Sequence, residues 1–317
     1  MTIHFKIERK LFLLTTNSLP FLVMFCSKSC MTTAESFHHF ECQTIHVNPE
    51  QENNIFEFAH RAVFEALGIF KKIEKLQRFV EDFSQVKTVF DFDFSKGDEK
   101  LTQKNLLQAV TSLQRNPMPK NLLLLMADHV KLMKSITKNP KHQKFLDEFM
   151  RKQMEILITN TFGMTDCDGE IVGSGTFPLS SLFNHSCAPN VVRVTVEDKL
   201  VFVTSKPVEI NQQLFVCYRS NFLASNKEKR QREIFKSYRF NCSCEACTNN
   251  FPTSEKLPKT DESFELPEFD TIFDEFKFNC IYIDENIKQF PNSEIATLIS
   301  RNQTILESIA NIAQLTT

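Results

Sequence analysis

The chain has 317 residues, of which 42% are hydrophobic and 24% are charged, so it can bury a sizeable core and does not have the composition of a disordered protein. The net charge of −2 at pH 7 argues against nucleic-acid binding through bulk charge. The most apolar N-terminal run, residues 11–25, is too short and too polar for a membrane span and lacks a signal-peptide cleavage site. These features predict a soluble intracellular protein.

The aromatic residues are unevenly chosen. The chain contains no Trp, and it has 3 Tyr compared with 32 Phe. Because this chain uses Phe wherever an apolar ring suffices, each remaining Tyr is expected to need its hydroxyl group. Tyr218 and Tyr238 both flank a cysteine-bearing stretch, which makes them candidates for a functional role.

The first cysteine group lies within residues 26–42, and its spacing places ligands about one helical turn apart. Close pairs, nearby histidines and no secretory signal favour zinc thiolates over disulfides. The alternative interpretation is a helix in which the cysteines occur by chance. Within the zinc interpretation, His39 could replace the adjacent His38 as a ligand. The predicted zinc ligands are Cys26, Cys30, His38 and Cys42.

Helical periodicity dominates the next part of the chain. Apolar residues recur at steps of three or four in residues 54–72, 121–135 and 141–160, which predicts amphipathic helices. Residues 47–159 are therefore expected to be mainly helical. Their apolar stripes are interpreted as core faces rather than ligand sites.

From Gly163 onward the pattern changes to short strands. Residues 191–196 and 200–203 are expected to form a hairpin, and residues 214–216 another short strand. Residues 222–238 and 293–315 are expected to be helices. The basic run on the first of these is interpreted as a solvated face, with a phosphate-binding patch or a localisation signal as alternatives. That run comprises Lys227, Lys229, Arg230 and Arg232.

A second cysteine group reads Cys242-x-Cys244-x2-Cys247 and supplies three thiolates. A closed structural zinc site takes four ligands, so the fourth must come from elsewhere in the chain. The alternative is a reduced, buried cysteine cluster without metal. The candidates for the fourth ligand are Cys187, Cys217, Cys167 and His185.

These motifs together resemble a known family. The run Asn184-His185-Ser186-Cys187-x-Pro189-Asn190, a strand that ends at Tyr218, and then Cys-x-Cys-x2-Cys is similar to the motif order of SET-domain protein lysine methyltransferases. Residues 26–42 look like the second half of a MYND zinc finger. The chain thus resembles the SET-and-MYND-domain (SMYD) family, most closely its tetratricopeptide-bearing branch and arthropod members. The resemblance covers residues 155–252 and 26–46 and is weak elsewhere.

The resemblance implies an α+β fold, in which a SET core of short strands carries a helical insertion, a zinc-stapled post-SET segment and C-terminal helices. The implied segments are an unassigned stretch at 1–25, a partial MYND-like finger at 26–46, a helical insertion at 47–159, the SET core at 160–222, the post-SET segment at 223–252 and a shortened helical region at 253–317.

The resemblance also implies residue roles. Tyr218 and Tyr238 match the catalytic tyrosines of the methyl-transfer channel. The residues that match contacts to S-adenosyl-L-methionine are Asn160, Asn184, His185 and Phe240. Cys187 matches the fourth zinc ligand, which completes the set Cys187, Cys242, Cys244 and Cys247.

The implied function is S-adenosylmethionine-dependent protein-lysine N-methylation of a histone or non-histone substrate. Partner proteins would bind the MYND-like segment, the chain would occupy cytoplasm and nucleus, and neither a membrane nor sequence-specific nucleic acid is expected as a partner. Departures from the family leave two interpretations open: an N-terminally truncated or mispredicted form of an active methyltransferase, or a divergent, catalytically impaired zinc-binding interaction module. A third interpretation, outside the family, is a zinc-stabilised interaction protein that binds partners through its MYND-like segment and C-terminal helix. No glycine precedes Gly68, so the Gly-x-Gly cofactor loop is missing and an N-terminal truncation is predicted. No Cys-x2-Cys pair precedes Cys26, and Asn211-Gln212-Gln213 replaces the usual Gly-Glu-Glu.

Overall fold

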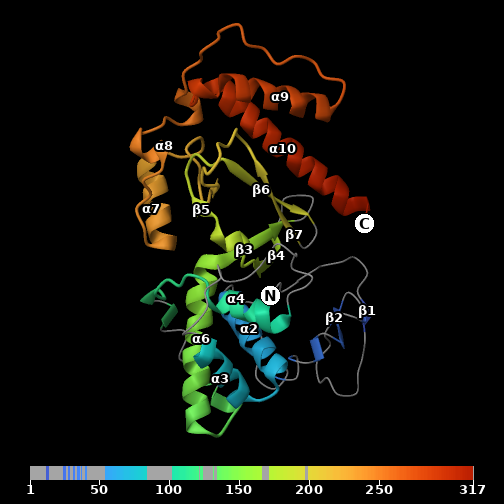
Figure 1. Cartoon of the computed structure of the whole chain (residues 1–317), viewed down its shortest axis with the longest axis vertical. Coiled ribbons are helices and arrows are strands. Elements are labelled where there is room, and N and C mark those ends of the chain that lie inside the picture. Colours follow the sequence, from blue (N-terminus) through green and yellow to red (C-terminus); the bar gives the residue numbers. More distant parts are fainter. Residues whose placement is uncertain are drawn as a thin grey trace. The chain divides into compact units, whose positions relative to one another are not determined.

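The computed structural model describes residues 12–13, 24–25, 28, 31–32, 34–35, 37, 40, 54–83, 102–120, 122–123, 131, 134–165, 171–196 and 199–316 (Figure 1). The chain divides into two compact units. The first comprises Met1–Gly163 and Val172–Ser181, and the second comprises Met164–Ile171 and Leu182–Thr317. The first predicted zinc site lies outside the described residues, since none of Cys26, Cys30, His38 and Cys42 is among them.

The described residues of the first unit are mainly helical. Its helices are α2 (Asn54–Phe70), α3 (Ile73–Phe83), α4 (Gln103–Thr111) and α6 (Pro140–Asn160), and it also holds the short antiparallel strands β1 (Phe12–Leu13) and β2 (Met24–Phe25). Helix α6 begins sharply because Asn139 caps it by accepting from Lys141 N, and Pro140 suits the first helical position. The predicted helix over 121–135 lies largely outside the described residues.

The core of the first unit lies between α2 and α6. Their apolar stripes face each other, and Phe64 and Met154 are fully buried in the resulting cluster. The periodicity over 54–72 and 141–160 therefore marks core faces, as expected. The glycine-bearing stretch that follows α6 forms β3 (Thr161–Thr165) and β4 (Ile171–Thr176), which pair with each other.

Strands among the described residues within 182–316 of the second unit form two small sheets. Strands β6 (Val191–Val196) and β7 (Lys199–Thr204) form the predicted hairpin, with Val191 opposite Thr204. Strand β5 (Asn184–His185) pairs in parallel with β8 (Phe215–Val216), and a 3₁₀ turn, η4 (Ser180–Leu182), precedes β5. The β5–β8 pair brings together two segments about thirty residues apart in the sequence.

A turn and one buried amide position strand β8. Gln212 N donates to Glu209 O at 3.0 Å, and Asn211 between them has a φ of 68°. The left-handed region favours glycine and tolerates asparagine, so Asn211 can replace the family's glycine here. The buried side chain of Asn190 then donates to Gln213 O at 3.0 Å and accepts from Phe215 N at 2.7 Å. The turn at residues 209–212 and the bonds from Asn190 thus fix the segment that leads into β8.

Helix α7 (Lys227–Tyr238) corrects two expectations. It begins at Lys227 rather than at residue 222, because Asn226 caps it by accepting from Lys229 N. Its basic run is not wholly a solvated face, since Arg230 is only 1% exposed. The helix ends at Arg239, whose left-handed conformation (φ 61°) turns the chain toward the cysteines.

The tail contains α8 (Glu245–Thr248), η5 (Ser254–Lys256), α9 (Ile272–Asn286), η6 (Ile287–Gln289) and α10 (Ser293–Thr316). Helices α9 and α10 pack on each other around Ile283 and Leu298, and α10 also contacts β6 (Figure 1).

The prediction of α10 is confirmed, whereas α9 was not predicted. The α+β fold class is confirmed. Among the described residues, no helix has the length and apolar character that crossing a membrane would require.

Candidate functional site

Both predicted catalytic tyrosines lie in the second unit, beside each other. Tyr218 follows β8 directly, and Tyr238 ends α7; their ring centroids are 4.7 Å apart. The ring of His185, on β5, lies 5.2 Å from that of Tyr218 and 6.1 Å from that of Phe240. The structure therefore brings together four of the residues predicted for catalysis and cofactor binding.

The two hydroxyl groups stay protonated near neutral pH. Burial, and secondarily the neighbouring Tyr238, raises the pKa of Tyr218 to about 12. Burial also raises the pKa of Tyr238, although the nearby Arg219 opposes this shift. The hydroxyl of Tyr218 donates to Phe183 O at 2.5 Å. The Arg219 guanidinium lies 5.9 Å from the centroid of the Tyr238 ring and donates to Ser237 Oγ at 3.1 Å.

His185 is buried and uncharged. Only 7% of it is exposed, and burial lowers its pKa to about 4. Its Nδ1 accepts a hydrogen bond from Tyr218 N at 3.1 Å. Its Nε2 lies 3.4 Å from Cys187 Sγ, so the ring stands between the backbone of Tyr218 and a cysteine.

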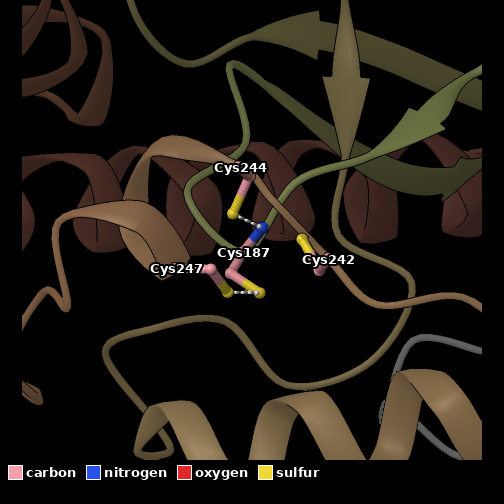
Figure 2. A group of neighbouring side chains, drawn as sticks. All are labelled: Cys187, Cys242, Cys244 and Cys247. Carbon is pink, nitrogen blue, oxygen red and sulfur yellow. Dashed lines mark hydrogen bonds between the residues drawn. The ribbon is translucent and has the colours of Figure 1, made fainter.

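Four cysteines form a compact cluster. Ligand atoms of Cys187, Cys242, Cys244 and Cys247 all lie within 4.8 Å of one another. Cys187 comes from the segment after β5 and the other three from the segment around α8 (Figure 2). In a tetrahedral zinc site with Zn–S bonds of 2.3 Å, the sulfurs are roughly 3.8 Å apart. The cluster therefore fits a zinc ion.

Among the described candidates for a fourth ligand, Cys187 is the one that lies in this cluster. Cys187 is the cysteine beside the Cys-x-Cys-x2-Cys segment: its Sγ lies 3.6 Å from Cys247 Sγ, and its N donates to Cys244 Sγ at 3.3 Å. Cys217 is not part of the cluster, and its thiol donates to Arg219 O instead. Cys167 lies outside the described residues.

Hydrogen bonds from thiols and backbone favour a thiolate within the cluster. The pKa of Cys244 is lowered, primarily because the Cys187 thiol donates to it and then because Cys242 does. Apolar side chains surround these sulfurs, among them Phe222 and Phe251. A dry shell of this kind suits a structural metal site.

Arg230 is a site residue that the sequence analysis missed. Its guanidinium donates to Ser225 O at 2.5 Å, and its Nη2 lies 3.5 Å from Ala246 O and 3.9 Å from Cys247 Sγ. A buried positive charge thus contacts the cysteine cluster. The sequence holds one signal for it: the apolar Ile234 stands four residues later, on the same face of the helix, and is buried in the structure.

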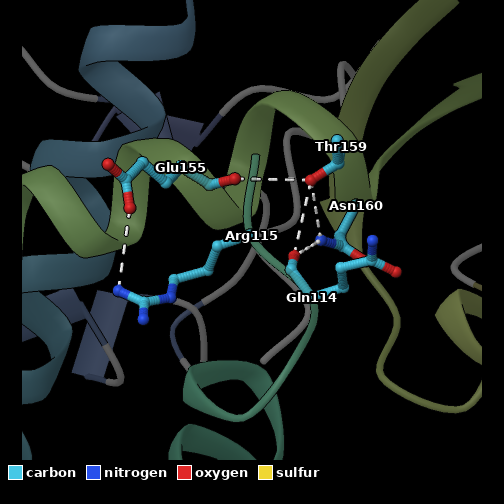
Figure 3. Close-up of polar contacts among 5 residues, drawn as sticks. All are labelled: Gln114, Arg115, Glu155, Thr159 and Asn160. Atoms are coloured by element: carbon cyan, nitrogen blue, oxygen red, sulfur yellow. Dashed lines mark hydrogen bonds and ion pairs between the residues drawn. The ribbon is translucent and has the colours of Figure 1, made fainter. Parts of the chain in front are cut away.

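Asn160 lies in the first unit, at the end of α6. Its Nδ2 donates to Gln114 O at 2.9 Å and to Ile156 O at 2.8 Å. Figure 3 shows this amide nitrogen turned toward the Gln114 carbonyl, beside an ion pair between Arg115 and Glu155. The cofactor contact predicted for Asn160 stays a prediction. Asn184, in the second unit, is exposed on β5.

Comparison with known proteins gives a consistent result. Residues 21–219 match the SET domain family. Human histone-lysine N-methyltransferase SMYD3 is 25% identical over 238 residues, which cover 74% of this chain and 48% of that protein. Chicken N-lysine methyltransferase SMYD2 is 31% identical over 153 residues, covering 44% of this chain and 34% of that protein. The chain thus spans about half of human SMYD3 and a smaller share of chicken SMYD2.

Proposed function

The chain belongs to the SET-domain family and is of the SMYD type, and from this premise we propose that it is a protein-lysine N-methyltransferase that uses S-adenosyl-L-methionine. The observation that carries the proposal is the pair of neutral tyrosines, Tyr218 and Tyr238, packed beside His185. Its relatives human SMYD3 and chicken SMYD2 carry methyltransferase activity in their names.

The tyrosines suit methyl transfer to an amine. S-adenosyl-L-methionine, when bound, supplies an electrophilic methyl group on a sulfonium. A lysine has a solution pKa of about 10.4 and must lose a proton before its nitrogen can attack. Buried aromatic walls disfavour the charged ammonium, and they exclude water from the reacting atoms. Tyr218 and Tyr238 are half-buried and would provide aromatic walls without adding a negative charge, since their hydroxyls stay protonated.

The orientation of one hydroxyl assigns it a specific task. The proton of Tyr218 Oη is already directed at Phe183 O. The lone pairs of the same oxygen are therefore what it can offer to an N–H of the substrate amine. In this proposal Tyr218 orients the amine as a hydrogen-bond acceptor, and Tyr238 forms the adjoining wall.

The second unit offers surfaces that fit an adenosyl group. Phe240 is 37% exposed although its ring contacts that of His185, so part of the residue is accessible to a ligand. Asn184 is exposed on the neighbouring strand. We assign Phe240, Asn184 and His185 to the cofactor pocket. The cofactor contact of Asn160, which lies in the first unit and whose amide protons point at backbone carbonyls, stays a prediction.

A zinc ion held by the four cysteines would serve a structural purpose. The side chain of Gln231, on α7, donates to Cys242 O at 2.6 Å and accepts from Cys242 N at 3.0 Å. Helix α7 is thereby fastened to the first cysteine of the tail. Tyr238 and Phe240 lie between Gln231 and Cys242 in the sequence. A zinc ion that fixes Cys242 would therefore also hold these two aromatic residues in place.

One sequence fact favours the alternative function, a zinc-binding interaction module without turnover. Asn211-Gln212-Gln213 stands where the resembled family usually has Gly-Glu-Glu, so amides replace the two carboxylates of that motif. A histone or non-histone substrate, partner binding through the MYND-like segment, and presence in cytoplasm and nucleus stay predictions.

Titration calorimetry of S-adenosyl-L-methionine into the zinc-loaded full chain tests the proposal. We expect saturable binding, followed by transfer of a radiolabelled methyl group to lysine when core histones or a lysine-peptide library are supplied. Absence of binding, with zinc bound and the fold intact by circular dichroism, would overturn the enzyme assignment and favour the interaction module.

A further inference from the structure

One side chain touches both the cysteine cluster and the segment that carries the proposed catalytic tyrosine. The imidazole of His185 lies 3.4 Å from Cys187 Sγ through Nε2, and it accepts from Tyr218 N through Nδ1 at 3.1 Å. The ring is buried, so both contacts are shielded from competition by water.

The hydrogen bonds determine which nitrogen carries the proton. A backbone N–H can only donate, so Nδ1 must accept through its lone pair in the bond from Tyr218. In a neutral imidazole the proton then resides on Nε2. That proton points toward Cys187, which is a ligand in the proposed zinc site and would be a thiolate there.

Strand pairing holds the ring in this position. In the β5–β8 ladder His185 stands opposite Val216, and Ser186 N donates to Val216 O at 3.0 Å. Cys187 is two residues after His185, and Tyr218 is two residues after Val216. The β5–β8 pairing thus places Cys187 next to Nε2 of the imidazole ring and the backbone of Tyr218 next to Nδ1.

We propose that His185 is a positioning residue that couples the zinc site to the catalytic segment: its Nε2–H donates to the Cys187 thiolate while its Nδ1 holds the backbone N–H of Tyr218. The catalytic consequence rests on the proposed methyltransferase function, whereas the bridge itself does not. A tetrathiolate zinc centre carries a net charge of −2, and donors to its sulfurs offset that charge. His185 supplies one such donor.

Two conservative variants separate the two ends of the bridge. The terminal atoms of asparagine reach about as far as Nδ1, so His185→Asn retains an acceptor for Tyr218 N and loses the donor to sulfur. Glutamine reaches about as far as Nε2, so His185→Gln retains the donor to sulfur and loses the acceptor. Metal content and circular dichroism serve as checks that each variant is folded and loaded.

The sulfur end is tested in cobalt-substituted protein. A hydrogen bond stabilises sulfur lone pairs, so its loss shifts the thiolate-to-cobalt charge-transfer band to longer wavelength. We expect this shift in His185→Asn and not in His185→Gln, together with roughly tenfold faster zinc loss to a chelator in His185→Asn. A band at the wild-type wavelength in His185→Asn would overturn the sulfur half of the bridge.

The tyrosine end is tested by exchange of the Tyr218 amide, measured by NMR. We expect at least tenfold faster exchange in His185→Gln and near wild-type exchange in His185→Asn. Equal protection in all three proteins would overturn this half. If the wild-type chain methylates lysine, kcat should fall about tenfold in His185→Gln while the KM for the lysine substrate is unchanged.

A spectrum of the wild-type chain keeps the proposal testable if either variant does not fold. Nitrogen-15 labelling of histidine should show His185 as the tautomer protonated on Nε2. The opposite tautomer would refute the bridge. These spectroscopic results do not depend on turnover, so a chain without methyltransferase activity would refute the proposed function and leave the bridge to be judged on its own.

Discussion

The hydroxyl of Tyr218 donates to the carbonyl oxygen of Phe183, a residue 35 positions earlier in the chain. Phe183 directly precedes strand β5, and Tyr218 lies just beyond β8. The parallel pairing of these strands therefore determines where the phenol oxygen sits, and the bond determines which way its proton points. A wrong placement of either strand would remove the proposed acceptor for the substrate amine.

Replacement of Tyr218 by Phe is expected to abolish methyl transfer without abolishing cofactor binding. The substitution removes one oxygen atom and keeps the ring that packs on Tyr238. We expect kcat to fall by about two orders of magnitude or more, as for other groups that orient a reacting proton or amine. Single-turnover transfer and calorimetric titration measure the two effects. Tyr282→Phe, on α9, is the matched control, and equal activity in both variants would refute the role of Tyr218.

Alkaline titration should identify Tyr218 directly. The chain has no Trp and 3 Tyr, so its near-ultraviolet tyrosinate signal is simple. An unfolded tyrosine ionises at about pH 10, whereas the pKa of Tyr218 is raised to about 12. Between these values the folded state holds more protons than the unfolded state, so stability falls as pH rises. The contribution is complete below pH 10 and is lost through pH 12. Tyr218→Phe should lose this last ionisation step, and an unchanged titration curve would contradict the assignment.

Regular periodicity in the sequence predicted the longer elements well. Helices α2, α6 and α10 each bury a continuous apolar stripe, and such stripes are visible in sequence before any packing is known. The expected start of α7 at residue 222 is too early, because Asn226 caps this helix. In the structure, Phe222 packs on the cysteine cluster and donates its N–H to Cys187 O.

The geometry of the site was less accessible to sequence reasoning. The pairing of β5 with β8 involves two residues in each strand, which is too short for any alternating pattern to appear. The gathering of Cys187 with the tail cysteines followed from the family resemblance, since spacing alone left four candidates. The burial of Arg230 depends on the carbonyls of Ser225 and Ala246, which approach it only in the folded chain.

Metal analysis of Cys244→Ser should show about one fewer zinc per chain than the wild type. Serine does not supply a thiolate, and the remaining three sulfurs cannot close a tetrahedral site. Cys280→Ser is the matched control because Cys280 is an exposed thiol on α9 and is outside the cluster. Equal zinc content in the two variants would show that the four cysteines do not hold the metal.

Arg230→Met is expected to weaken zinc retention and to destabilise the second unit. The guanidinium is buried and donates to two carbonyls and toward Cys247 Sγ, so its loss removes charge-assisted hydrogen bonds worth about 2 kcal/mol. Zinc transfer to a colorimetric chelator should be faster than in the wild type. Arg232→Met is the control, because Arg232 lies on the exposed face of the same helix. Indistinguishable transfer rates in the two variants would contradict a role for Arg230 at the cluster.

Position 211 should tolerate glycine and reject a β-branched residue. Asn211 has a φ of 68° and an exposed side chain, so the effect of substitution comes from its backbone conformation. Asn211→Gly should be at least as stable as the wild type, whereas Asn211→Val should lose about 1–2 kcal/mol, because a β-carbon is costly in the left-handed region. Urea unfolding of the zinc-loaded chain measures both. Ile210, 92% exposed, provides the control variant Ile210→Val, for which no change is expected. If Asn211→Val were as stable as Asn211→Gly, the turn would not need this conformation, and Asn211 could not be explained as the substitute for the family's glycine.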